Sequence, residues 1–313
     1  MRWVAAFAIG LLALGAVVKV SVAQAPPVPP LVKPGFTTKI AENVYVIPDH
    51  DVRLVPNIGI LVGQNGILVV DTGMGPKNAE TVLGEVRKIS NKPILYLAIT
   101  HMHPEHGMGA QSFPSETKVI YAEAQKKELA DKAERFIKFF SGFSPQIAEL
   151  LKPVRIVQPT ETFQSEARLN LGGFPVQLLH FGASHTRGDT LIYLPEQGII
   201  FAGDVVVNGW FPIMPDNDSS GKNWIATLEK LKGMKLKTVV PGHGPVGQPT
   251  MIDPLQTYLT TLRSEVTTLQ KQGKSQEEVV SALTPVFKER YGTWKDNQWL
   301  KNAIGRFYAE ATM

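Results

Sequence analysis

The stretch richest in possible chemistry is residues 101–106, HMHPEH, where three imidazoles and a carboxylate fall within six positions. The whole chain has only seven histidines, so chance is a poor explanation for three of them at His101, His103 and His106. Neutral imidazole combined with the carboxylate of Glu105 suits zinc or iron best. Pro104 argues against a helix through the motif and favours a tight, non-helical turn. The stretch therefore predicts a metal site.

Buried strands have to position these side chains. A short apolar run, Pro93–Thr100, leads directly into the motif and is typical of a buried strand. Earlier in the chain, Asn65-Gly66 supplies a hairpin turn into another buried strand, Ile67–Asp71. Apolar residues at helical spacing predict a helix over Lys77–Ile89 between the two strands. This strand, helix, strand order favours an α/β fold.

Three more polar residues follow predicted strands in the second half of the chain: His185, Asp204 and His243, each in a glycine-containing loop. A single Asp after a strand is more often a turn or capping residue. Together with the motif, however, the three positions favour one shared site. The strands expected here and elsewhere are 40–47, 58–62, 119–121, 176–181, 190–194, 199–202 and 238–240, with a helix over 224–231.

The two halves of the chain repeat a pattern. Gln64–Ile67 leads to Asp71, and Glu196–Ile199 leads to Asp204, in each case a turn followed by a buried strand that ends in Asp. The spacing from glycine to aspartate differs by one residue between the halves. We infer a duplicated half-domain.

Taken in order, the possible ligands resemble a known pattern. His-x-His-x-carboxylate-His, a later His, an Asp and finally Pro-Gly-His-Gly are similar to the metallo-β-lactamase-fold hydrolase superfamily, over about Ile40 to Gly247. The resemblance implies an αββα sandwich with metals at the open edge between two sheets. It also implies two metal ions with three ligands each: His101, His103 and His185 for the first, and Glu105, His106 and His243 for the second.

The resemblance gives two aspartates further roles. Asp204 would bridge both metal ions, and Asp71 would orient a ligand imidazole by hydrogen bonding. His50 and His180 match no ligand position and are interpreted as a loop and a strand histidine. The family usually has Asp where this chain has Glu105, which is one methylene longer. Glu105 is thus a ligand with altered geometry, part of a weak second site, or mainly a base.

The N-terminus has the three regions of a secretory signal peptide. Arg2 precedes an apolar run over Trp3–Val18, and the small residues that follow favour cleavage after Ala23, giving a signal over 1–23. The run is short for a membrane span, so an uncleaved anchor is the lesser alternative. We expect a periplasmic or secreted protein without stable membrane insertion, and a proline-rich linker over 24–36.

Composition and charge exclude several classes of function. Without Arg2 and Lys19 the net charge falls from +4 to +2, and no Lys/Arg-rich run is present, which removes the electrostatic case for nucleic-acid binding. The chain contains no cysteine, so any metal site must use His and carboxylates. The expected partner is a small-molecule substrate, and the oligomeric state is left open.

We expect one metallo-β-lactamase-fold domain over 37–250. A helical insertion over about 122–151 interrupts it and could act as a lid. Residues 251–313 are predicted to form a helical extension packed on the same domain. Its expected helices, which would cover one side of the sheets, are 254–272, 276–290 and 296–311.

The predicted chemistry is hydrolysis. A zinc pair lowers the pKa of a bound water towards about 7, and the resulting hydroxide would open an amide or ester bond. Glu105 and Asp204 would be the catalytic carboxylates that orient the nucleophile and move its proton. Export favours β-lactam or lactone ring opening over a thioester hydrolase of the glyoxalase II type. A mononuclear-iron persulfide dioxygenase, which uses two His and the Asp, is the alternative of a different class.

Residues near Asp204 narrow the resemblance further. The segment from Gly203 through Pro212 to Trp224, together with residues 103–106 and 109–113, is similar to exported metallohydrolases found near quinoprotein dehydrogenases and sulfur-oxidation systems. Trp210, Phe211 and Met214 would line an apolar wall next to the metals, or would serve simply as core or loop anchors.

Overall fold

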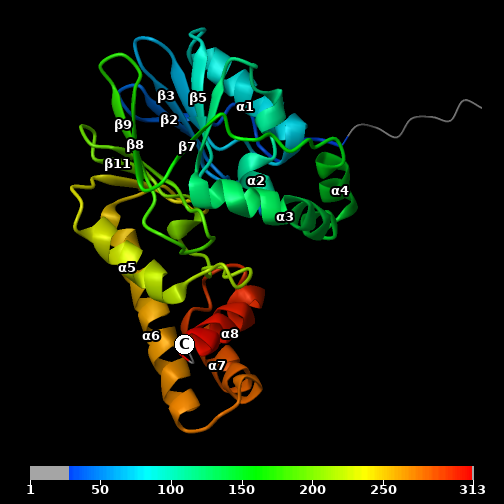
Figure 1. Ribbon diagram of the computed structural model, residues 1–313, viewed down its shortest axis with the longest axis vertical. Helices are drawn as coiled ribbons and strands as arrows, with labels where there is room; N and C mark the ends of the chain where they lie inside the picture. Colours follow the sequence, from blue (N-terminus) through cyan, green and yellow to red (C-terminus); the bar gives the residue numbers. More distant parts are fainter. Residues whose placement is uncertain (1–27, 312–313) are drawn as a thin grey trace, which may run out of the picture.

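Two β-sheets stacked face to face form the centre of the protein (Figure 1). The structure, a computed structural model, describes residues 28–311. In the larger sheet the strands lie in chain order, antiparallel from β1 to β4 and parallel from β4 to β7. They are β1 (Thr38–Ala41), β2 (Val44–Ile47), β3 (Ile58–Val62), β4 (Ile67–Val70), β5 (Ile94–Ala98), β6 (Lys118–Ala122) and β7 (Glu161–Phe163).

The second sheet has the order β12-β11-β10-β9-β8. Its strands are antiparallel except for the parallel pair β11 and β12. They are β8 (Glu166–Asn170), β9 (Pro175–Leu179), β10 (Leu191–Leu194), β11 (Ile199–Phe201) and β12 (Thr238–Val240).

Helices make the parallel connections and cover the outer faces of the sheets. Because parallel strands cannot be joined by a tight turn, α1 links β4 to β5, α3 and α4 lie between β6 and β7, and α5 links β11 to β12. The helices are α1 (Gly75–Ile89), α2 (Pro104–Gly107), α3 (Glu123–Ser141), α4 (Pro145–Leu151), α5 (Gly221–Lys232), α6 (Ile252–Lys271), α7 (Gln276–Arg290) and α8 (Leu300–Ala311). Short 3₁₀ turns are η1 (Ala110–Ser112), η2 (Gly203–Val205), η3 (Pro249–Met251) and η4 (Asn297–Trp299).

Three apolar cores hold the layers together, and β4 shows how its sequence serves two of them. Ile67 and Val69 pack in the core shared with α1 and α3. Leu68 and Val70 pack in the core between the two sheets. The third core joins the second sheet to α5 and the C-terminal helices. Because side chains alternate along a strand, a continuous apolar run buries both faces. The predicted α/β sandwich in αββα order is confirmed.

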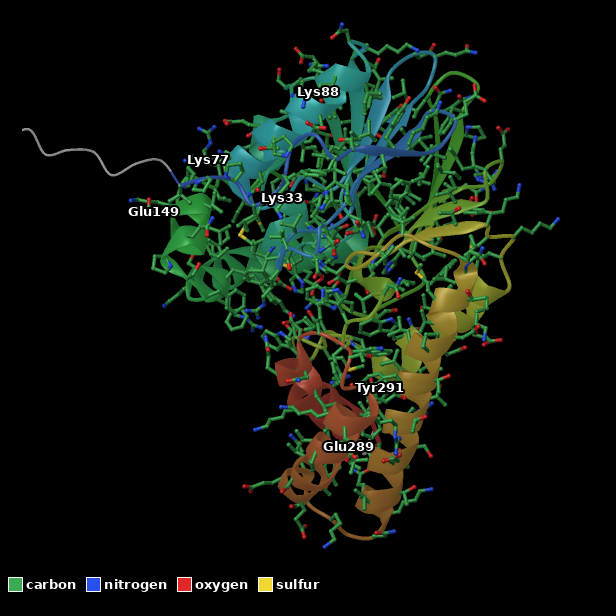
Figure 2. All side chains as sticks on the ribbon, turned by 180° about the vertical axis from the view of Figure 1, so that it is seen from behind. Lys33, Lys77, Lys88, Glu149, Glu289 and Tyr291 are labelled. Atoms are coloured by element: carbon green, nitrogen blue, oxygen red, sulfur yellow. The ribbon has the colours of Figure 1, made fainter. Side chains whose placement is uncertain are left out.

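The C-terminal helices form a lobe beside the sandwich (Figure 1). Helix α6 packs on α5, and α7 and α8 pack on α6. Figure 2 shows the molecule from behind, with Lys77 and Lys88 on α1 and Tyr291 in the C-terminal lobe. The predicted helices are present and share a core with α5 and the second sheet. They extend away from the sheets and do not cover one side of them (Figure 1).

One strand prediction needs correction, and two strands are not predicted from the sequence. The run Ile40–Ile47, expected as one strand, forms β1 and β2, because the chain turns at Asn43 in the left-handed conformation with φ 59°. Asparagine tolerates that conformation better than most residues. The sequence does not predict β7 and β8, because Glu161–Phe163 and Glu166–Asn170 carry charged, partly exposed side chains instead of an apolar run.

The predicted linker also needs correction where the structure describes it. Over residues 28–36 the chain lies against α1: Asn78 Oδ1 accepts hydrogen bonds from the backbone N–H groups of Leu31 and Val32, and Val32 is buried. Residues 1–27, with the predicted signal peptide and the start of the linker, lie outside the described residues. None of the helices within residues 28–311 combines the length and apolar character that crossing a membrane requires.

Candidate metal centre

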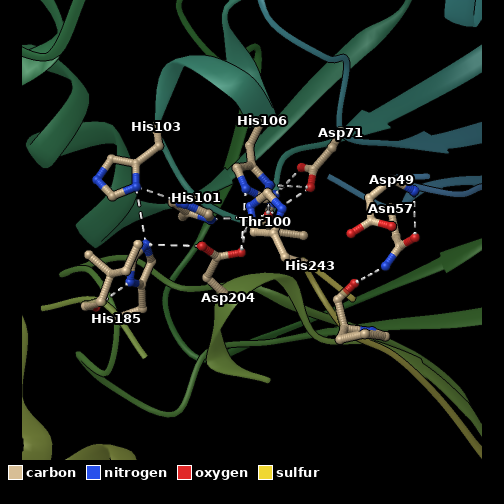
Figure 3. A network of polar contacts seen from close by, with 12 residues as sticks. Asp49, Asn57, Asp71, Thr100, His101, His103, His106, His185, Asp204 and His243 are labelled. Atoms are coloured by element: carbon tan, nitrogen blue, oxygen red, sulfur yellow. Dashed lines mark hydrogen bonds and ion pairs between the residues drawn. The ribbon is translucent and has the colours of Figure 1, made fainter. Parts of the chain in front are cut away.

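Several strands end at one edge of the sandwich, and the predicted site residues follow them. Asp71 follows β4, and His101 comes shortly after β5. Asp204 and His243 follow β11 and β12, and His185 lies in the loop after β9. Strands β4 and β5 are parallel, and β9, β11 and β12 also share one direction. Their carboxyl ends therefore deliver side chains from both sheets to a single point (Figure 3).

The HMHPEH motif runs into a short helix, which corrects the predicted non-helical turn. His103 has an extended conformation (φ −62°, ψ 149°) just before α2, and Pro104 is the first helical residue. Proline is tolerated there because the first N–H of a helix has no partner within the helix. Glu105 and His106 then lie in α2 and are both buried.

The possible ligand atoms form three overlapping groups, and the atoms of each group lie within 4.8 Å of one another. The first and the last match the two sets that the resemblance implied. Asp204 lies between these sets: its Oδ2 is 3.5 Å from His185 Nε2, and its Oδ1 is 3.5 Å from His106 Nε2. The structure thus brings all the predicted ligands together. The groups are His101–His103–His185, His101–His106–Asp204 and Glu105–His106–His243.

Hydrogen bonds on the far side of three imidazoles aim their Nε2 atoms at this point. His185 Nδ1 lies 2.7 Å from the carbonyl oxygen of Ile213, and His243 Nδ1 lies 3.0 Å from that of Val55. A carbonyl oxygen accepts a hydrogen bond, so each Nδ1 carries the proton and Nε2 keeps a free lone pair. His106 Nδ1 faces a carboxylate instead, with Asp71 Oδ2 at 2.8 Å.

Three buried polar atoms at this point have no hydrogen-bond partner: Glu105 Oε2, His106 Nε2 and Asp204 Oδ1. Each such atom costs about 1–3 kcal/mol when left unsatisfied. Imidazole nitrogens also crowd together, with His103 Nδ1 only 3.0 Å from His101 Nε2. Lone pairs and carboxylate oxygens directed at shared positions suit a divalent cation. The residues present therefore fit a metal pair held by His and carboxylates.

In the first group, the electrostatics favour the ligand form of His101 and His103. Burial and then the neighbouring His106 lower the pKa of His101 well below its usual value. Burial and then His185 do the same to the pKa of His103. A neutral imidazole is the form that binds a metal.

The second group holds more negative charge. Burial and the nearby Asp204 raise the pKa of Glu105 to about 7, against the opposing influence of His106. Burial disfavours the charged form of His106, but Asp71 and Asp204 outweigh it and raise the pKa of that imidazole to about 9. The side chain of Glu105 is one methylene longer than that of Asp, and its carboxylate lies within ligand distance of His106 and His243.

Residues 52–243 of the sequence match the family described as the metallo-beta-lactamase superfamily. The chain belongs to this superfamily. The matched range includes every predicted ligand, from His101 to His243.

Two relatives and one solved structure illustrate the range of this superfamily. The linear primary-alkylsulfatase of Pseudomonas sp. (strain ATCC 19151) is 26% identical over 283 residues, which cover 75% of this chain and 53% of the relative. The acyl-coenzyme A thioesterase MBLAC2 of Bos taurus is 28% identical over 210 residues, covering 60% and 72%. The structure of the sec-alkylsulfatase Pisa1 from Pseudomonas sp. has a TM-score of 0.68 at 15% identity, over 88% of this chain and 50% of its own.

The chain spans about half the length of the alkylsulfatases that it matches. At 15% identity the structural likeness shows the fold alone. The metallo-beta-lactamase superfamily is therefore the level at which the comparisons identify this protein.

Sequence analysis missed three residues that support the site. Thr100 Oγ1 donates a hydrogen bond to Asp71 Oδ2 at 2.9 Å and thereby fixes the carboxylate beside His106. Asn57 Nδ2 donates to the carbonyl oxygens of Pro241 and Gly244, on both sides of His243. Asp49 Oδ2 accepts from the N–H of Gly244. Only the position of Thr100, directly before the motif, could have drawn attention to it.

The metal centre of this superfamily member opens into a pocket with about 540 Å³ of empty space, its open mouth included. Of the three predicted wall residues, Trp210 lines the pocket, and Phe211 and Met214 do not. The segment carrying them runs between the pocket and the C-terminal core, so its side chains divide between the two. Ile213 also faces the pocket, whereas Phe211 packs against Tyr258 in the core, with ring centroids 5.6 Å apart.

Proposed function

We propose that the protein is an exported, zinc-dependent hydrolase that opens an amide or ester bond, with β-lactams and lactones as candidate substrates. One observation carries this proposal. Side chains of the ligand groups, among them Glu105, Asp204 and His243, line an open pocket, and the buried atoms Glu105 Oε2 and Asp204 Oδ1 have no hydrogen-bond partner there. A purely structural metal site would be closed off by protein ligands, whereas a catalytic one faces a cavity.

The protein groups have distinct roles in such a reaction. When bound, a zinc pair supplies Lewis acidity and a water molecule of lowered pKa. Asp204 lies between the two ligand groups and orients the reacting centre. Glu105 Oε2 is buried and unpartnered at the pocket floor, and it accepts the proton released during attack and returns it to the leaving group. Asp71 and Thr100 hold His106 in place.

Export and substrate choice rest on separate arguments. The apolar run at the N-terminus is the basis for a periplasmic or secreted location. That location favours β-lactam or lactone ring opening over hydrolysis of cytosolic thioesters, although a thioesterase is among the relatives.

A second candidate reaction is hydrolysis of a sulfate ester. The alkylsulfatase relative matches 75% of this chain, against 60% for the thioesterase, so the match extends further along the chain. The same carboxylates would then serve attack on an ester of sulfuric acid in place of a carboxylic ester.

The test is a screen of the zinc-loaded protein against nitrocefin, a lactone, a p-nitrophenyl ester, an acyl thioester and an alkyl sulfate. Turnover of a carbonyl substrate that is lost in His101→Ala and kept in His180→Gln supports the first proposal. His180 is a suitable control because its Nδ1 bonds the Asp189 carbonyl and it belongs to none of the three ligand groups. Turnover of the sulfate alone would favour the second candidate, and turnover in His101→Ala would contradict both.

Metal analysis tests the alternative of a different class. Two zinc ions per chain after purification support the hydrolase. One iron per chain, with oxygen uptake on a persulfide, would overturn it in favour of the dioxygenase.

A further inference from the structure

The pocket above the candidate metal centre has an aromatic wall that comes from separate parts of the chain. Helix α3 and the residues after it supply Phe136, Phe139, Phe140 and Phe143. Trp299 is supplied by η4, in the C-terminal lobe. We name these five residues the aromatic wall.

The wall begins at the metal ligands and continues to the surface. Phe136 lies against His103, with ring centroids 4.6 Å apart. Phe139 is 46% exposed and meets Trp299 edge to face at 6.1 Å. Helical spacing places Phe136 and Phe140 on the same side of α3. An apolar surface therefore runs from the floor of the pocket to its mouth.

The segment that carries Trp299 is tied to the metal-binding domain by several contacts. The backbone of Lys295 exchanges hydrogen bonds with the chain beside Trp210: its N–H donates to Gly209 and its carbonyl oxygen accepts from Phe211. Arg53 Nε lies 3.4 Å from Asp296 Oδ1 across the pocket mouth. Trp299 is therefore held as a fixed part of the pocket.

The charges of the pocket give no separate site for an anion. Within the described residues that line it, Arg53 is the only Lys or Arg. Its guanidinium is paired with Asp296 and lies over the Phe143 ring, 5.4 Å from the centroid. A paired arginine on an aromatic face is a poor partner for a highly charged substrate tail. An uncharged apolar group suits the wall better.

We propose that the aromatic wall binds an alkyl or aryl group of the substrate, so that the enzyme selects substrates with an apolar chain attached to the reacting group. This proposal rests on the proposed hydrolase function for the identity of the substrate, but the wall itself can be tested by binding. Each methylene fully buried on the wall strengthens binding by up to about fourfold.

The test measures binding of straight-chain hydroxamic acids from C2 to C10 to the zinc-loaded protein by calorimetry. The hydroxamate group chelates zinc in every member of the series, and only the tail changes. For the wild type we expect affinity to rise by about two- to fourfold per methylene over the first several carbons. Trp299→Ala and Phe139→Ala should flatten this slope and leave the affinity for acetohydroxamate unchanged.

Val286→Ala is the matched control, since Val286 is an apolar side chain of α7 that is 40% exposed and does not line the pocket. Phe139→Ala alters an exposed residue, so it keeps the test valid if Trp299→Ala folds poorly. The proposal that the aromatic wall binds an apolar group would be overturned by a wild-type affinity that does not change with chain length. It would also be overturned if affinity rose with chain length in both variants as steeply as in the wild type. A chain-length slope in a protein that hydrolyses nothing in the screen would support the wall and count against the hydrolase.

Discussion

Asp71 and His106 form a fully buried pair, with the Asp71 Oδ2 atom 2.8 Å from His106 Nδ1. Asp71 follows β4, and His106 lies in α2, after the neighbouring strand β5. Asp71 has a left-handed φ of 65°, which lets its carboxylate turn toward the imidazole. Its Oδ1 also accepts a hydrogen bond from the Thr100 N–H at 2.8 Å. The pair fixes which nitrogen of His106 is available to a metal.

Replacing Asp71 with Asn should weaken zinc binding by about ten- to a hundredfold, because the neutral amide no longer holds the imidazole in its ligand orientation. Asn tolerates the left-handed backbone, so the fold should persist. Zinc affinity measured by competition with a chromophoric chelator checks this. Asp51→Asn is the control, because Asp51 has a similar φ of 61° and is exposed. Equal affinities in the Asp71 variant and the wild type would contradict the supporting role.

Glu105 decides how many metal ions the site holds. We expect Glu105→Ala to bind one zinc ion in place of two, because the group with His106 and His243 loses its carboxylate. Glu105→Asp should bind the second zinc about tenfold more weakly than wild type, since α2 fixes the backbone and the shorter side chain withdraws from the group. Zinc-to-protein ratios after dialysis and chelator titration measure both. Tighter binding by the Asp variant would show instead that the extra methylene strains the site.

Asn57 connects the loop before β3 to the loop that carries His243. Asn57→Ala removes its hydrogen bonds to Pro241 and Gly244 and leaves buried carbonyl groups unpaired. We expect a loss of about 2–4 kcal/mol in the free energy of unfolding, together with weaker binding of the second zinc. Urea unfolding of the zinc-free and zinc-loaded proteins measures both effects. Asn91→Ala, at an exposed position, should change stability little, and an equally small loss at Asn57 would refute the prediction.

Gly242 leaves room for Asp204. An added Cβ at Gly242 would lie 2.0 Å from Asp204 Oδ1, so Gly242→Ala must displace the carboxylate between the ligand groups. We expect at least a hundredfold loss of hydrolysis with reduced zinc content. Gly247→Ala, whose Cβ would meet only the flexible end of Met251, is the control. Wild-type zinc content and turnover in the Gly242 variant would show that Asp204 tolerates another position.

Local pattern accounts for the parts of the site that sequence predicts. The motif around His101 and the glycine-rich loops around Asp204 and His243 follow buried strands, and continuous apolar runs mark such strands clearly. The direction of parallel strands then brings their ends together. The candidate positions are accessible from sequence for this reason, whereas their division into two ligand sets is what the resemblance to the superfamily implies.

The parts that sequence misses depend on packing between distant segments. Asn57 meets the carbonyl of Gly244 across 187 positions, and no periodicity in either loop points to the other. Phe211 and Met214 are as apolar as Trp210, so composition could not tell which of them faces the pocket. Trp299 reaches the pocket only because the C-terminal lobe docks beside it.

Glu128 gives the protein a pH-dependent stability that does not involve the metal ligands. This carboxyl of α3 is buried, and burial followed by the charge of Asp189 raises its pKa to about 8, against opposing contacts from Arg187 and Lys132. A carboxyl with a raised pKa binds its proton more tightly in the folded state, so its contribution to stability is present below about pH 4.5 and is lost as pH rises to about 8.

The neutral variant Glu128→Gln should therefore gain stability relative to wild type as pH rises from 5 to 8, by at most about 1.4 kcal/mol per pH unit, and gain no more above that range. Urea unfolding of both proteins across this pH range measures the difference. Glu134→Gln, an exposed position in the same helix, should follow the wild type at every pH. Parallel curves for Glu128→Gln and wild type would mean that Lys132 and the Arg187 N–H keep the buried carboxyl ionised throughout.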